Sequence, residues 1–200
     1  TFVTVSKTMT DISDDDFCIK VNRKNYMVQF TGDISPKSVH LLKNAIMDVV
    51  NSFKKADSRV VHLHLQSEGG CLFSGMGMID WCKLMKRMFD FKLHCYCAGL
   101  VASAASNIFL AGDERWCGKN SYMLIHALST NISGDLCIST GFEEAKHDVK
   151  NDQIIMNQLI AFYKERTTIT DKMICKCMKK DIYLTYAHCV KYGFDNTQNL

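Results

Sequence analysis

The spacing of hydrophobic residues follows one of two patterns in each part of this chain. Period-two runs predict strands, whereas apolar residues three and four apart predict helices. The strands are expected at Phe17–Val21, Tyr26–Thr31, Arg59–Leu65, Lys92–Cys97 and Tyr122–Ala127. Helices are expected after the N-cap candidate Ser35 with Pro36 behind it, after Gly69-Gly70, over Ala102–Ala111 and about Phe142–Arg166, and near Asp171–Met178 and Tyr186–Tyr192. This order predicts an α/β fold of βαβ units with a mainly parallel sheet.

Two of these segments place side chains of chemical interest on defined faces. In the strand at Arg59–Leu65, His62 and His64 share the face opposite Val61, Leu63 and Leu65. Two such histidines could share a metal ion, but no third ligand is nearby, so packing beneath another element is favoured. The helix after Gly69-Gly70 is rich in methionine and is expected to bury mainly Phe73, Met76, Leu84, Met85 and Met88.

Length and composition indicate an ordinary globular protein. With 200 residues, 47% of them hydrophobic, we expect one domain over 26–200, preceded by an N-terminal segment and first strand over 1–25. A net charge of +3 with scattered Lys and Arg does not favour nucleic-acid binding. No apolar run is long enough to span a bilayer and no signal peptide opens the chain, so we expect a soluble protein without membrane partners.

Ten cysteines are many for this length. Most lie in periodic apolar segments, where a reduced thiol packs as a small hydrophobic group, and their spacings do not match common zinc sites. We therefore expect a reducing, cytoplasmic compartment, with an organelle or a virus-infected cell as alternatives. No metal and no cofactor are expected.

Three features fall at or near the carboxyl ends of expected parallel strands, where the sites of such folds collect: Gly69-Gly70, Ser103 and His126. A serine nucleophile needs a base and oxyanion donors. His126 is the candidate base, and the N–H groups at Ala104 and the glycine turn are candidate donors. A lone histidine at a strand end is more often structural, and the absence of G-x-S-x-G disfavours an α/β-hydrolase.

Three blocks of the chain resemble the central blocks of the ClpP-like serine peptidases, the proteolytic subunits of the Clp protease. They read HLHLQSEGGCLFSGMGMIDW, CAGLVASAASNIFLAG and NSYMLIHA, and a weaker likeness covers about 170 residues. The resemblance implies a ClpP/crotonase-like spiral of βαβ units with a protruding handle helix at about 142–166. It implies the nucleophile Ser103, the general base His126, oxyanion-hole amides at Gly70 and Ala104, and Ser106 as a packing residue.

The family also implies a functional context for these residues. The activity would be a serine endopeptidase acting on unfolded polypeptides, with the 128–141 segment beside the substrate. The partners would be further copies of the chain in heptameric rings stacked as a tetradecamer, and an AAA+ unfoldase that alone uses ATP.

The chain departs from the family pattern at several positions. Glu68 and Ala127 stand where the family carries proline, and Cys177 occupies the position of the aspartate that orients the base. Loss of that aspartate costs a serine protease on the order of ten-thousandfold in turnover. Asp181, Asp171 or a carboxylate of a neighbouring subunit could substitute, or a Ser–His dyad could suffice.

Other functions remain open alternatives at this point. The chain could be a catalytically weak or inactive ring subunit, because Cys177 replaces the aspartate. It could also be a crotonase-type acyl-CoA enzyme, which needs no serine, or a viral or phage maturation protease of the same clan.

Overall fold

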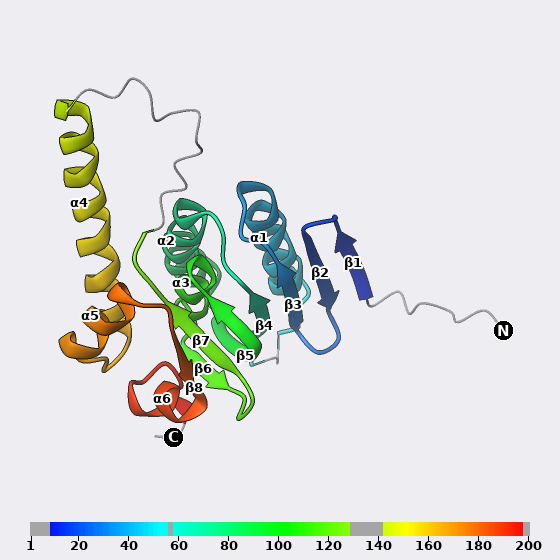
Figure 1. The fold of residues 1–200 in the computed structure, drawn as a ribbon. Helices are drawn as coiled ribbons and strands as arrows, with labels where there is room; N and C mark the ends of the chain where they lie inside the picture. The colour runs from blue at the N-terminus through cyan, green and yellow to red at the C-terminus, as the bar shows by residue number, and fades with distance from the viewer. Residues whose placement is uncertain (1–8, 56–57, 129–141, 198–200) are drawn as a thin grey trace.

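The computed structural model describes residues 9–55, 58–128 and 142–197. Within these residues, eight strands form one mixed sheet in the order β1-β2-β3-β4-β5-β7-β8, with β6 also paired to β5 (Figure 1). The strands are β1 (Met9–Ser13), β2 (Phe17–Asn22), β3 (Met27–Gly32), β4 (Val60–Ser67), β5 (Lys92–Ala102), β6 (Glu114–Cys117), β7 (Tyr122–Ile125) and β8 (Ile182–Thr185).

The centre of the sheet is parallel, as predicted, and its margins are antiparallel. β3, β4 and β5 run parallel, and β5 pairs in parallel with β6 near its start and with β7 near its end. The β1–β2–β3 meander and the β7–β8 pair are antiparallel. The N-terminal strands β1 and β2 thus belong to the same sheet as the rest of the chain.

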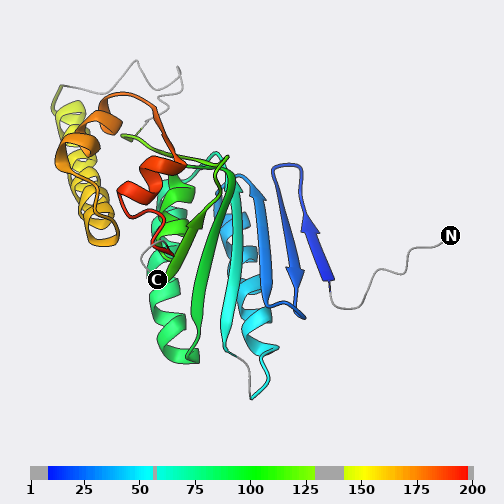
Figure 2. The same cartoon turned by 90° about the horizontal axis from the view of Figure 1, so that it is seen from below.

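The helices separate into two groups. They are α1 (Pro36–Asn51), α2 (Leu72–Phe89), α3 (Ala104–Leu110), α4 (Phe142–Arg166), α5 (Asp171–Lys179) and α6 (Tyr186–Lys191). The first three cover one face of the sheet, whereas α4, α5 and α6 gather at the end farthest from β1 (Figures 1 and 2). The expected start of α1 is confirmed, because Ser35 caps the helix by accepting a hydrogen bond from the Ser38 N–H. The expected range of α4 is also confirmed.

The buried face of α2 differs from the expectation. Its buried residues are Gly75, Met78, Ile79 and Cys82, whereas Phe73, Leu84 and Met88 are exposed. Gly75 explains the difference, since a Cβ there would lie 2.7 Å from the Ala104 carbonyl oxygen. The close approach of α2 to α3 at this glycine turns the larger apolar residues outward.

The short strand β6, which the pattern did not predict, ties the C-terminal region to the sheet. The Arg115 side chain is buried and donates hydrogen bonds to the backbone carbonyls of Gly112, Arg166, Gly193 and Phe194. Burial, followed by the nearby Arg166 charge, lowers the pKa of Arg115 to about 10. One cation thus joins the ends of α3, α4 and α6.

The other face of the sheet carries the two histidines of β4. Val61, Leu63 and Leu65 are fully buried, while His62 and His64 are half-buried and lie against Tyr96 of β5. The two histidines therefore pack against a neighbouring strand of the same sheet, whereas packing beneath another element was expected. In the part of the chain that the structure describes, no group of three or more His, Cys, Asp or Glu is placed to hold a metal ion.

Candidate active site

Ser103 occupies a single-residue turn between β5 and α3. Its φ of +52° and ψ of −128° are unusual for a residue with a side chain. The turn is fixed on both sides, because the Ser103 N–H donates to the Leu124 carbonyl at 2.8 Å and the Ser103 carbonyl accepts from the Ser106 N–H and hydroxyl. A backbone held in so sparse a region costs about 1–3 kcal/mol, and such residues cluster at functional sites.

A glycine pair packs directly against this turn. Gly69 and Gly70 have φ of +112° and +133°. A Cβ on Gly69 would lie 2.5 Å from the Cβ of Ser103, and a Cβ on Gly70 would lie 2.3 Å from the Ile34 carbonyl oxygen. Backbone hydrogen bonds of 2.7 Å from Ile34 to Gly69 and from Cys71 to Ile34 hold the pair in place. Both positions therefore require glycine.

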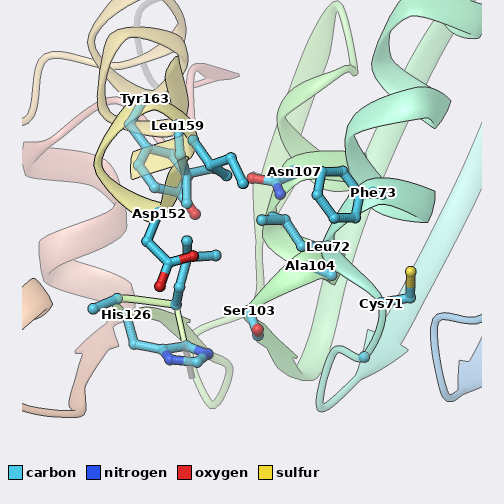
Figure 3. Close-up of a pocket in the computed structure, with 14 residues that line it drawn as sticks. Cys71, Leu72, Phe73, Ser103, Ala104, Asn107, His126, Asp152, Leu159 and Tyr163 are labelled. Carbon is cyan, nitrogen blue, oxygen red and sulfur yellow. The ribbon is translucent and has the colours of Figure 1, made fainter. Parts of the chain in front are cut away.

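One pocket of about 320 Å³ brings together all four residues expected to perform or support catalysis, namely Gly70, Ser103, Ala104 and His126. Figure 3 shows the Ser103 hydroxyl and the His126 ring on the same side of this pocket. Both side chains border this space, and among the described residues no hydrogen bond joins them. The remaining lining residues are Cys71, Leu72, Phe73, Asn107, Ala127, Leu128, Asp152, Ile155, Leu159 and Tyr163.

No third group orients His126 within the described residues, where no hydrogen bond or ion pair reaches its ring. Cys177 is fully buried in α5, and that burial raises the pKa of its thiol. Asp171 is exposed and paired with Lys164 at 2.8 Å, and Asp181 is exposed between α5 and β8. None of these three residues lines the pocket. The expected segment beside the substrate falls largely on 129–141, outside the described residues.

Ser106 packs as expected and also links two helices. It is fully buried, and its hydroxyl donates to the Ser103 carbonyl at 2.6 Å. The same oxygen lies 3.2 Å from the Tyr163 hydroxyl on α4. Since the Ser106 proton is already committed, Tyr163 is the donor. The two serines are thus distinct, one exposed to the pocket and one holding the turn beneath it.

Three polar pocket residues were not singled out from the sequence: Asn107, Asp152 and Tyr163. Asn107 stands in the otherwise small or apolar helix that begins directly after Ser103. A polar amide at that place in the sequence could have identified Asn107. Asp152 and Tyr163 depend on how α4 lies against α3, and no local pattern in α4 reveals this.

The protein has a mixed α/β fold, and one pocket is lined by Ser103 and His126, which follow β5 and β7. The model of the Clp protease family matches residues 23–197, and the chain belongs to this family. The chain is 26% identical over 197 residues to the ATP-dependent Clp protease proteolytic subunit 2 of Borreliella burgdorferi. The aligned region covers 92% of this chain and 91% of that protein. No helix in the described residues is long and apolar enough to cross a membrane.

Proposed function

We propose that this protein is a serine endopeptidase that cleaves peptide bonds in unfolded polypeptides. The observation that carries the proposal is the shared pocket, in which Ser103 stands on a strained turn with His126 and Gly70 on the surrounding wall. Membership of the Clp protease family supports a peptidase over an acyl-CoA enzyme of similar fold.

The reaction follows from the position of these groups. His126 takes the proton of the Ser103 hydroxyl as the oxygen attacks the substrate carbonyl. The backbone N–H groups of Gly70 and Ala104 then stabilise the negative oxygen of the tetrahedral intermediate. His126 returns the proton to the leaving amine, and a water molecule activated by His126 hydrolyses the acyl-enzyme and frees Ser103.

The proposed assembly is a pair of stacked rings built from copies of this chain. The exposed face of α2 supports association, because Phe73, Leu84 and Met88 are 68%, 46% and 62% exposed. We propose that α4 is the handle helix between the rings. The name of the Borreliella burgdorferi relative suggests an ATP-dependent partner, which would be an unfoldase that delivers substrate.

A second candidate function is a catalytically weak or inactive ring subunit. The observation in its favour is the His126 ring, for which the described residues offer no orienting partner, together with the buried thiol of Cys177 in the position of the family aspartate. The two candidates differ in one measurable property, which is hydrolysis by the purified assembly.

The decisive experiment measures degradation of an unfolded polypeptide such as casein by the native assembly. We expect slow hydrolysis that is abolished in Ser103→Ala and reduced at least a hundredfold in His126→Gln. Ser58→Ala and His40→Gln are matched controls at exposed positions and retain full activity. Activity that persists in Ser103→Ala contradicts the peptidase proposal, and complete inactivity of the intact assembly supports the inactive subunit.

A further inference from the structure

A buried asparagine, Asn107, lines the pocket. It is 1% exposed, and among the described residues neither its Nδ2 nor its Oδ1 has a hydrogen-bond partner. Figure 3 shows the amide pointing from α3 toward α4 across the pocket. Buried polar groups nearly always have partners, and the exceptions call for an explanation. A bound polar group would supply the missing partner.

The carboxylate of Asp152 faces the same space. Asp152 lines the pocket from α4, and Figure 3 shows its carboxylate directed inward, above the His126 ring. Among the described residues Asp152 forms no ion pair, and the pocket lining includes no Lys or Arg. Among the lining residues that the structure describes, Asp152 is the one carboxylate, so it places an acidic group in the pocket.

The rest of the pocket suits an aliphatic stem. Leu72, Leu128, Ile155 and Leu159 supply apolar walls on the approach to the polar groups. Asn107 is the fourth residue of α3, which begins directly after Ser103, so it lies roughly 5 Å along the helix axis from the helix start. A flexible four-carbon chain attached at the reacting residue covers about this distance. The pocket therefore has apolar walls, with the Asn107 Oδ1 as a buried acceptor and the Asp152 carboxylate on the α4 side.

We propose that this pocket selects a lysine or arginine side chain on the residue whose carbonyl Ser103 attacks. This inference rests on the proposed peptidase function and specifies its substrate class. The cation pairs with Asp152 and donates to the Oδ1 of Asn107, while the stem packs against the leucine and isoleucine walls. An uncharged side chain of equal length leaves Asp152 and Asn107 without partners.

The test compares peptides that differ only at the residue before the cleaved bond. These residues are lysine, arginine, glutamine, norleucine and glutamate, and kcat/KM is measured for each. We expect lysine and arginine to exceed norleucine by at least about tenfold, with glutamate lowest. Asp152→Asn lowers kcat/KM for the lysine peptide by about tenfold or more and leaves the norleucine peptide within about twofold. Glu165→Gln, an exposed charge change on the same helix, leaves all values unchanged.

A binding measurement separates this inference from the proposed function. Ser103→Ala protein is titrated with product peptides that end in lysine or in norleucine, and affinity is measured by calorimetry. Tighter binding of the lysine product, weakened by Asp152→Asn and by Asn107→Leu, supports the inference even if the wild type hydrolyses nothing. Equal or tighter binding of the norleucine product, or a hydrolytic preference for norleucine, glutamine or glutamate, overturns it. The folding of each variant is checked by its thermal midpoint.

Discussion

Replacing Gly70 with alanine tests the turn that positions the site. The new Cβ would lie 2.3 Å from the Ile34 carbonyl oxygen, well inside van der Waals contact, and the backbone at φ +133° is one that side chains rarely adopt. The strain contributes about 1–3 kcal/mol and the overlap about 1–3 kcal/mol more. We therefore expect Gly70→Ala to lower the free energy of unfolding by about 4 kcal/mol, a large part of the stability of a typical domain.

Relief of that overlap has a consequence for catalysis. The Ile34 backbone must move away from Gly70, and the two 2.7 Å hydrogen bonds that hold the glycine turn lengthen with it. In the proposed mechanism, the Gly70 N–H would then no longer point at the substrate oxyanion. Loss of one oxyanion donor costs about 100- to 1,000-fold in turnover. Peptide hydrolysis by Gly70→Ala should fall by that factor under conditions in which the variant is folded.

Gly77 provides the matched control. It lies in α2, and a Cβ there would meet nothing within 4 Å. Gly77→Ala should stabilise the protein by about 0.5–1 kcal/mol, because alanine loses less backbone freedom in a helix. Both variants are compared with wild type by urea unfolding, using the same slope of unfolding free energy against urea concentration. A Gly70→Ala protein within 1 kcal/mol of wild type would refute the assignment of a tight, glycine-dependent turn.

Three further predictions concern other parts of the molecule. Arg115→Met removes four hydrogen bonds to backbone carbonyls and should cost about 3–5 kcal/mol in urea unfolding, whereas a loss under 1 kcal/mol would contradict the anchoring role. Burial lowers the pKa of His62 and His64 below 6.5, so their contribution to stability is complete above pH 6.5 and is lost as the pH falls through the lowered values. The His62→Gln/His64→Gln variant should lose less stability between pH 7 and 5 than wild type. An equal loss would show that these histidines do not cause the pH dependence of stability. Cys177→Asp should raise kcat/KM by at least about tenfold if a carboxylate there orients His126, whereas an unchanged rate would show that a carboxylate at this position does not orient it.

Local patterns predicted the elements with strong signals of their own. Ser35-Pro36 marked the start of α1, and the long polar segment Phe142–Arg166 predicted the bounds of α4. The four-residue strand β6 is too short for a clear period, and the buried Arg115 in it reads as a surface residue. Its charge is satisfied by carbonyls distant in sequence, so only the tertiary structure reveals it.

In the candidate site too, local patterns identified some residues, and tertiary packing alone revealed others. Ser103 and His126 were singled out because each lies at or near the end of an expected strand, and parallel strands end at one edge of a sheet. The resemblance to the ClpP-like peptidases then implied their roles. The outward face of α2 was predicted wrongly, because the decisive contact is between Gly75 and Ala104 of another helix. Asp152 entered the pocket only through the packing of α4, which the sequence of α4 alone does not specify.

Covalent labelling shows whether Ser103 is an activated nucleophile. The native assembly is treated with a fluorophosphonate probe, and the modified residue is located by mass spectrometry. An activated nucleophile predicts one adduct per chain, on Ser103, forming at least a hundredfold more slowly in His126→Gln and absent in Ser103→Ala. An unlabelled Ser103 in the native assembly, or labelling that proceeds equally fast without His126, would contradict the account.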